Sequence, residues 1–380
     1  MRVVRLSDDT DIKKHLSDIG VDAGGVDILY SKALHYLIHI KALYVGGANI
    51  LKQDALSIGA DLAVPKGCVT AEQKYVDCIL IASKKHLKIL AKKELAQPFG
   101  LKELALKLNK ILKAQKPKQV KIMGIINAND DSFFEGSRFK GKSAIQKIIS
   151  MAEDGADIID IGGVSSRPNA PVVSGDEELL RVKSILDTIK EQKLYEDIIF
   201  SIDSYTPKVV EYAMECGFGI LNDITGLQDD EVCKICAKYG AVAVIMHMQG
   251  NPQTMQNNPQ YDDILSDIYD FFTTRMQKAE SFGIKDVVLD VGIGFGKTLQ
   301  DNLKLIKHLE HFLDLGKEIL VGASRKSMID MISPATTDER LAGSLALHMQ
   351  SVANGASYIR VHDVKEHAQM LRVYESLKGV

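Results

Sequence analysis

From about residue 118 onward, short apolar runs alternate with longer amphipathic stretches in a regular order. Between most of the runs, apolar residues recur with a helical period, at residues 142–156, 177–192, 207–217, 262–283 and 301–312. Strands that alternate with helices form parallel sheets through right-handed crossovers, so the pattern predicts an α/β fold. The apolar runs have the length of strands and occupy residues 120–127, 157–163, 198–204, 219–225, 242–248, 287–292, 318–324 and 358–364.

The number of these units decides between two α/β architectures. Eight strand–helix units over roughly 260 residues match a closed (β/α)8 barrel, the TIM-barrel fold. An open doubly wound sheet is the alternative, and it usually has fewer strands and a Gly-rich first turn. The turn after the first run reads "NANDDSF" and contains no G-x-G-x-x-G. We therefore expect a (β/α)8 barrel over residues 118–380.

Residues 1–112 follow a different pattern. Strands are expected near residues 1–6, 34–40 and 76–82, with helices at 10–20 and 46–60. We expect a small α/β or α+β N-terminal domain of unknown function. Residues 85–113 read as a helical connector with a break at Pro98-Phe99-Gly100, and a polar seam at 113–121 separates the two domains.

Composition narrows the range of functions. No run of about 20 uncharged apolar residues is present and the N-terminus lacks a leader pattern, so we expect a cytoplasmic protein without a membrane partner. Residues 1–120 hold 20 Lys and Arg against 12 Asp and Glu, although the net charge of the whole chain is −3. This asymmetry indicates either docking of oppositely charged segments or a solvated helical face. Nucleic acid is not an expected partner, because no aromatic residues are interleaved with the lysines.

Two short motifs resemble functional ones. Cys233 and Cys236 form a C-x-x-C inside an expected helix, whereas a redox pair sits at the start of a helix, so we interpret them as structural. The stretch "GIGFGKT" is not a P-loop, because only three residues separate Gly292 from Gly296 and Val291 stands at the first glycine position. We expect its small residues to let the backbone approach a flat ligand, with Phe295 stacking nearby.

Polar residues follow every expected strand. In a (β/α)8 barrel the active site lies at the carboxyl ends of the strands, so these side chains are expected to share one rim. Single cases have ordinary explanations such as helix capping, but eight together indicate a site. The residues are Asn127, Asp160, Ser165, Ser166, Arg167, Asp203, Ser204, Asn222, Asp223, His247, Asp290, Arg325, Lys326, Arg360, His362 and Asp363.

The residue types suggest a planar heterocycle with an attached anion. Asp203, Asn222 and Asp290 are acceptors that would meet the N–H groups of an amino-lactam edge, as in a guanine or a pterin, with Lys326 opposite. A cationic group of Arg167, Arg325, Arg360 and His362 suits phosphate or carboxylate oxygens. Asn127 offers an oxygen to Mg²⁺. His362 shares a side of its strand with Arg360, whereas His247 fits a core position or a functional one equally well.

These residues together resemble the dihydropteroate synthase family. The resemblance covers about residues 118–380 and is carried in order by "MGIINANDDSFFEG", "DIGGVSSRP", "SIDSYTPKV", "LNDITGL", "MHMQGNPQTMQ", "LDVGIGFGKT", "GASRKSMI" and "RVHDV". It implies an enzyme of folate biosynthesis that joins 6-hydroxymethyl-7,8-dihydropterin diphosphate to p-aminobenzoate and releases diphosphate. It also implies Mg²⁺ as cofactor, small-molecule substrates and a sulfonamide target, and we expect a homodimer.

The resemblance assigns roles by position. It places the pterin on Asp160, Asp203, Asn222, Asp290 and Lys326, with Asp160 supporting the pocket from behind. By the same resemblance the diphosphate is bound by Asn127, Ser166, Arg360 and His362, and the metal is bound by Asn127. The p-aminobenzoate site is formed by Phe133, Arg167, Pro168, Phe295 and Ser327. In the family this site forms when the loops after the first two strands become ordered. Lys326, Arg360, His362 and Asp203 are the expected catalytic residues, in an SN1-like path where C–O cleavage precedes attack.

Several positions depart from the family pattern. The family's first loop usually reads Thr-Pro-Asp-Ser-Phe, and here residues 129–133 read Asn-Asp-Asp-Ser-Phe; the second loop has Val164-Ser165-Ser166 for Glu-Ser-Thr. Val291 and Ile293 replace a usual proline and aromatic. Two other functions share the pocket residues: a barrel methyltransferase that binds methyl-tetrahydrofolate, and a catalytically silent binding protein. Diphosphate release from the two substrates separates the three.

Overall fold

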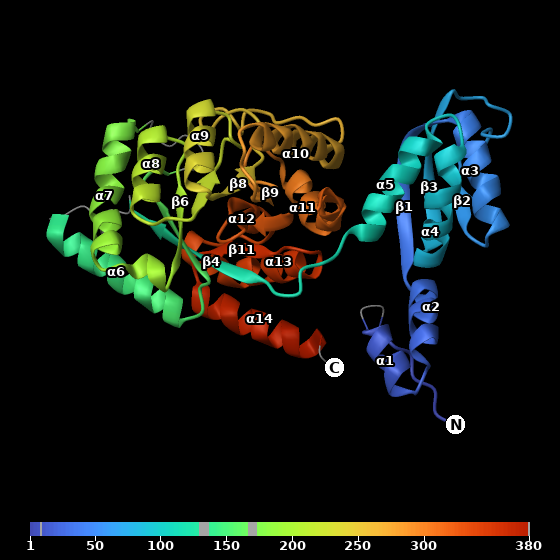
Figure 1. Ribbon diagram of the computed structural model, residues 1–380, viewed down its shortest axis with the longest axis horizontal. Coiled ribbons are helices and arrows are strands. Elements are labelled where there is room, and N and C mark those ends of the chain that lie inside the picture. Colours follow the sequence, from blue (N-terminus) through green and yellow to red (C-terminus); the bar gives the residue numbers. More distant parts are fainter. Residues whose placement is uncertain (8–9, 129–136, 166–172, 379–380) are drawn as a thin grey trace. The chain divides into compact units, whose positions relative to one another are not determined.

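The chain divides into two compact units, Met1–Ala114 and Gln115–Leu377. The computed structural model describes residues 1–7, 10–128, 137–165 and 173–378 (Figure 1). No helix of these residues has the length and apolar character needed to cross a membrane.

The first unit is built on a three-stranded antiparallel sheet with the strand order β1-β3-β2. Its elements are α1 (Ile12–Asp18), α2 (Ala23–Ala33), β1 (His35–Tyr44), α3 (Val45–Ser57), β2 (Asp61–Ala63), β3 (Tyr75–Ser83), α4 (Lys84–Lys93), the 3-10 helix η1 (Glu94–Ala96) and α5 (Leu101–Lys113). Along β3, buried residues such as Val76 and Leu80 alternate with exposed residues such as Ile79, so one face of the sheet forms the core.

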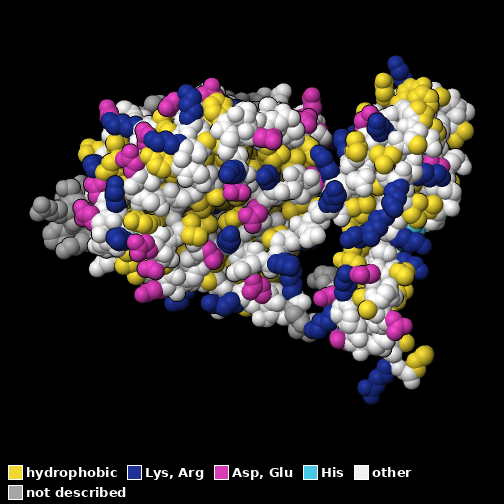
Figure 2. Space-filling model, in the orientation of Figure 1, with side chains coloured by type: hydrophobic (Ala, Val, Ile, Leu, Met, Phe, Trp, Pro, Cys, Tyr) yellow, Lys and Arg dark blue, Asp and Glu magenta, His cyan; other side chains and the backbone are white. Residues whose placement is uncertain are grey.

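Two expectations for this unit were wrong, and two of its elements were not predicted. Residues 1–7 form no strand, and the helix α2 and the strand β2 were not anticipated. The stretch 85–113 is not a connector, because Leu87 and Leu90 of α4 and Leu108 of α5 belong to the core of this unit. The break at Pro98-Phe99-Gly100 is present, and Gly100 precedes α5 with a φ of 82°. Lysines of α4 and α5, such as Lys88 and Lys107, are exposed, and Figure 2 shows Lys and Arg side chains gathered on this unit.

The second unit is a closed barrel of eight parallel strands, which confirms the predicted fold. The strands are β4 (Lys121–Asn127), β5 (Ile158–Gly162), β6 (Ile199–Asp203), β7 (Ile220–Asp223), β8 (Val242–Met246), β9 (Val287–Asp290), β10 (Glu318–Val321) and β11 (Tyr358–Val361). They follow one another around the barrel in chain order, and β11 closes it by pairing with β4.

Helices between the strands surround the barrel, as Figure 1 shows. They are α6 (Ser137–Glu153), α7 (Gly175–Glu191), α8 (Pro207–Glu215), α9 (Asp230–Tyr239), α10 (Ile264–Ser281), α11 (Leu299–Lys307), α12 (Ser327–Ile332), α13 (Leu341–Ala353) and α14 (Val364–Lys378), with 3-10 helices η3 (Leu194–Glu196), η4 (Leu309–Leu315) and η5 (Thr337–Arg340). Local sequence fixes several starts: the Ser174 hydroxyl accepts a hydrogen bond from the Glu177 amide at the beginning of α7.

Two apolar layers result from the period-two alternation of the strands. Outward residues such as Ile159 and Ile161 of β5 pack against the helices, whereas Ile158 points into the barrel. The inward residues form an apolar plug inside the barrel, and the candidate site lies on the side of this plug nearer the carboxyl ends of the strands. The plug residues are Met123, Ile158, Ile220, Val244, Val288, Leu320 and Tyr358.

Candidate active site

A polar layer lies directly above the apolar plug. Because successive side chains of a strand alternate between its two faces, the residue two positions after a plug residue also points into the barrel. This places polar groups at Asp160 after Ile158, Asn222 after Ile220, Asp290 after Val288 and Arg360 after Tyr358. The carboxyl ends of the strands therefore supply one cluster of acceptors and a cation, as expected for the fold.

Arg360 is the centre of this layer. Its Nε donates to Asp160 Oδ2 and its Nη2 donates to Asp203 Oδ2, each at 2.6 Å. Asn222 Nδ2 donates to the same oxygen of Asp160 at 3.0 Å. Asp160 is fully buried, and its other oxygen, Oδ1, has no hydrogen-bond partner among the described residues. Asp160 thus orients both Asn222 and Arg360.

Burial perturbs the carboxylates of this layer. It raises the pKa of Asp203 to about 7, an effect that the neighbouring Arg360 guanidinium opposes. Burial also raises the pKa of Asp290, although the Gly292 amide donates to Asp290 Oδ1 at 2.8 Å and favours the charged form. Perturbed carboxylates in a barrel mouth are characteristic of functional sites.

An apolar wall faces the carboxylates. Ile224, Met246, Met255 and Phe295 form a small cluster of buried side chains at the rim. The ammonium of Lys326 lies 4.1 Å from the centre of the Phe295 ring, a cation–π distance. Apolar surface beside these acceptors suits a planar heterocycle.

The Gly-rich loop after β9 allows close packing. A Cβ on Gly292 would lie 2.0 Å from the His247 carbonyl oxygen, and Gly292 has a φ of 65°, so only glycine fits there. The lysine of "GIGFGKT" turns inward: Lys297 Nζ donates to the carbonyl oxygens of His247, Gly292 and Phe295 at 3.1, 2.9 and 2.8 Å. A P-loop lysine would face a phosphate, so Lys297 instead holds the loop that carries Phe295.

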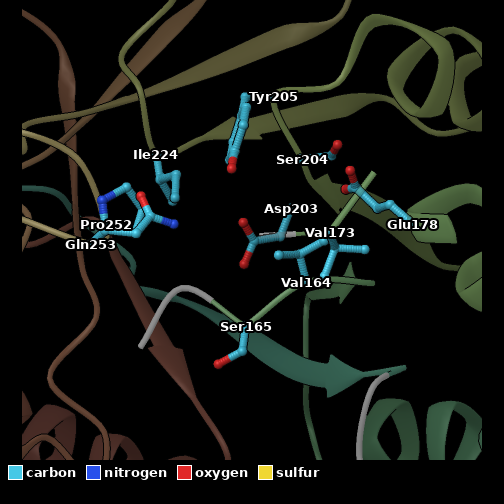
Figure 3. Close-up of a pocket in the computed structure, with 10 residues that line it drawn as sticks. All are labelled: Val164, Ser165, Val173, Glu178, Asp203, Ser204, Tyr205, Ile224, Pro252 and Gln253. Carbon is cyan, nitrogen blue, oxygen red and sulfur yellow. The ribbon is translucent and has the colours of Figure 1, made fainter. Parts of the chain in front are cut away.

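Asp203 opens into a pocket that Figure 3 shows in close-up. Its carboxylate projects into the pocket, and the Tyr205 hydroxyl points toward the same space. Sequence reasoning missed Tyr205, Ile224 and Gln253, although Ile224 stands two positions after Asn222 and could have been found by the alternation of the strand. The pocket is lined by Val164, Ser165, Val173, Glu178, Asp203, Ser204, Tyr205, Ile224, Pro252 and Gln253.

The described members of the expected cationic group, Arg325, Arg360 and His362, are not free cations. Arg325 Nε and Nη2 donate to the two oxygens of Asp363, at 3.1 and 2.6 Å, and Nη1 donates to Asp338 at 3.0 Å. Arg325 therefore ties loops together. His362 is neutral, because burial lowers its pKa to about 3, and its Nδ1 lies 3.0 Å from the Ser324 hydroxyl. Arg360 is paired with carboxylates, as described above.

The remaining candidates divide by position. Asn127 ends β4 beside Gly162 and is half-buried, while Ser327 is exposed at the start of α12. His247 is a core histidine: it is buried against Phe271 with ring centres 4.8 Å apart, and burial lowers its pKa to about 2. The candidates Phe133, Ser166, Arg167 and Pro168 lie outside the described residues.

Asp223 and the cysteines of α9 have structural roles in the barrel. Asp223 accepts hydrogen bonds from the Thr225 and Leu227 amides, so it shapes the loop after β7 while Asn222 faces the site. Cys233 and Cys236 are free and buried in α9, and burial raises the pKa of Cys236 to about 12, which confirms their structural interpretation.

The fold and the site define an enzyme of the (β/α)8 class with acceptors for a flat heterocycle above an apolar plug. The chain belongs to the pterin binding enzyme family, which it matches over residues 123–362. The polar layer, from Asp160 to Arg360, falls within this match, and the first unit precedes it in the sequence.

Individual relatives agree with this assignment. The bifunctional dihydropteroate synthase/dihydropteroate reductase of Helicobacter pylori is 41% identical over 378 residues, which covers 100% of this chain and 99% of that protein. The dihydropteroate synthase of Escherichia coli is 39% identical over 258 residues, covering 67% of this chain and 90% of that one. The structure resembles Xanthomonas albilineans dihydropteroate synthase in complex with 7,8-dihydropteroate, with a TM-score of 0.61, 31% identity and coverage of 69% and 95%.

Proposed function

We propose that the chain is a dihydropteroate synthase, a transferase of folate biosynthesis. It joins 6-hydroxymethyl-7,8-dihydropterin diphosphate to p-aminobenzoate and gives 7,8-dihydropteroate and diphosphate. The observation that carries the proposal is the inward layer of Asp160, Asp203, Asn222 and Asp290 beside the Phe295 wall, within a match to the pterin binding enzyme family.

In this function the carboxylates act on the heterocycle. Asp203 and Asp290 accept the N–H groups of the amino-lactam edge, and their negative charge favours positive charge that develops on the pterin methylene. The arylamine nitrogen of p-aminobenzoate is already a nucleophile near neutral pH, so attack needs no protein base. We therefore propose an SN1-like path in which the C–O bond breaks before the C–N bond forms.

The leaving diphosphate needs cations. Arg360 and Lys326 are the charged candidates at the rim, whereas His362 is neutral and serves as a hydrogen-bonding group. Asn127 offers an amide oxygen, a hard ligand that Mg²⁺ accepts together with phosphate oxygens. Bound there, Mg²⁺ would neutralise charge on the leaving group.

The test measures diphosphate release from the full chain with both substrates and Mg²⁺, and identifies dihydropteroate by mass. Lys326→Met should lower turnover, whereas Lys365→Met removes an exposed lysine at the start of α14 and should not. Pterin binding without diphosphate release would support the silent binding protein instead. Methyl transfer from methyl-tetrahydrofolate would support the methyltransferase.

We propose a second activity, reduction of the dihydropteroate product, because the Helicobacter pylori relative covers both units and its name includes a dihydropteroate reductase. The Escherichia coli synthase covers only 67% of this chain. The reduction adds a hydride to carbon and a proton to nitrogen of the dihydropterin C=N bond, with a reduced nicotinamide or flavin as the hydride donor.

The first unit has its own core, so it can be removed. The full chain should oxidise the reduced donor only when dihydropteroate is present. A chain that begins at Gln115 should keep synthase turnover and lose this oxidation. Oxidation that persists in the shortened chain would exclude the first unit from the reductase.

We also propose that the enzyme is a cytoplasmic homodimer. All five cysteines are free, as in a reducing compartment. Light scattering tests the dimer, and cell fractionation tests the location.

A further inference from the structure

Arg360 occupies the acceptor that the proposed function assigns to the pterin. Its guanidinium bridges Asp160 on β5 and Asp203 on β6 with two charge-assisted hydrogen bonds of 2.6 Å. The side chain of Asp160 is fully buried, and those of Asp203 and Arg360 are 15% and 19% exposed. Contacts this short in so little solvent are among the stronger polar contacts in proteins.

The Oδ2 atom of Asp203 therefore has two competing uses. A pterin N–H group that bonds to Asp203 Oδ2 meets the position of Arg360 Nη2. A diphosphate that takes the guanidinium removes the cation from two buried carboxylates. If only the pterin or only the diphosphate binds, either Arg360 or Asp203 is left as a buried charge without a partner. The free-energy cost of that unpaired charge exceeds the net contribution of the hydrogen bond between them.

We propose that Arg360 determines specificity for the diphosphorylated pterin by an exchange of partners. In the empty site Arg360 holds Asp203. In the complex Asp203 accepts hydrogen bonds from the pterin N–H groups instead of from Arg360. Arg360 then binds the diphosphate instead of Asp203. The two halves of the substrate therefore bind cooperatively, and a pterin without phosphates must displace Arg360 with nothing to receive it. This inference rests on the proposed synthase function.

The coupling can be measured because diphosphate is a separate molecule. Calorimetry gives the affinity of 6-hydroxymethyl-7,8-dihydropterin with and without saturating Mg²⁺-diphosphate. We expect diphosphate to raise pterin affinity by roughly 10- to 100-fold, the range of a charge-assisted hydrogen bond, and pterin to raise diphosphate affinity by the same factor.

Two variants separate exchange from simple proximity. Arg360→Gln should abolish the coupling to within about twofold, since no cation links the two halves. Asp160→Asn leaves Asp203 as the only carboxylate of Arg360, so pterin alone should bind more weakly and the coupling should increase. Arg360→Lys, which keeps the charge but cannot bridge two carboxylates, provides a second test if the glutamine variant does not fold.

The outcomes are distinct. Equal pterin affinity with and without diphosphate in an enzyme that turns over would overturn the exchange and leave the synthase function intact. Unchanged coupling in a folded Arg360 variant would also overturn it. Failure of the wild-type chain to bind the pterin at all, with no turnover, would overturn both proposals.

Discussion

Asp203 should make pterin binding depend on pH in the neutral range. A pterin N–H group needs an ionised carboxylate as its acceptor, and burial raises the pKa of Asp203 to about 7. At lower pH the empty site holds a proton that binding must expel. With a single such proton, affinity should be about 10-fold lower at pH 6 and about 100-fold lower at pH 5 than at pH 8.5.

The assay is calorimetric titration of 6-hydroxymethyl-7,8-dihydropterin across this range, in two buffers of different ionisation enthalpy to count the proton released. Asp203→Asn should bind roughly 10- to 100-fold more weakly at high pH, because it lacks the charge, and the slope assigned to Asp203 should be lost. His362 cannot produce the effect, because its pKa of about 3 keeps it neutral throughout.

Asp290 is the matched control, since burial raises its pKa as well. In Asp290→Asn the slope assigned to Asp203 should remain. A flat profile in the wild-type enzyme, or a slope that survives in Asp203→Asn, would refute the reasoning.

Other predictions concern the buried histidines, the cysteines and the chemical step. His348 Nδ1 lies 2.8 Å from His367 Nε2, and His367 Nδ1 lies 2.6 Å from the Asp363 carbonyl oxygen, so His367→Ala should cost about 1–3 kcal/mol in thermal or urea unfolding. Burial lowers the pKa of both histidines, so the unfolded chain binds protons at a higher pH than the folded chain does. The free energy of unfolding should therefore fall as the pH drops below about 6.5. His367→Ala should lose less stability than the wild type between pH 6.5 and pH 5 in the same melts. Cys233 and Cys236 should react with a thiol reagent only on unfolding, and rapid labelling of the native protein would contradict their burial. Deuterium at the pterin methylene should give a secondary isotope effect above unity when chemistry is rate-limiting, whereas a value near unity would indicate associative attack.

The barrel could be predicted from the sequence because the patterns that indicate its strands and helices are local. Each strand is an apolar run and each helix has its own period, so eight repeats define the architecture before any contact is known. The alternation of a strand also determines that Asp160 and Arg360, each two positions after a plug residue, point inward. The first unit was less predictable: the three-residue strand β2 is too short to leave a periodic signal, and α2 contains two glycines.

Only the tertiary structure decided which polar groups pair and which carry charge. Asp160 and Arg360 are 200 positions apart in the chain, and no local pattern shows that their side chains meet at 2.6 Å. The sequence alone placed Arg325 and His362 in one cationic group. In the folded barrel Asp363 and Asp338 hold Arg325, and burial keeps His362 neutral. Charge state and pairing depend on desolvation and on neighbours from distant strands, and these exist only once the barrel has closed.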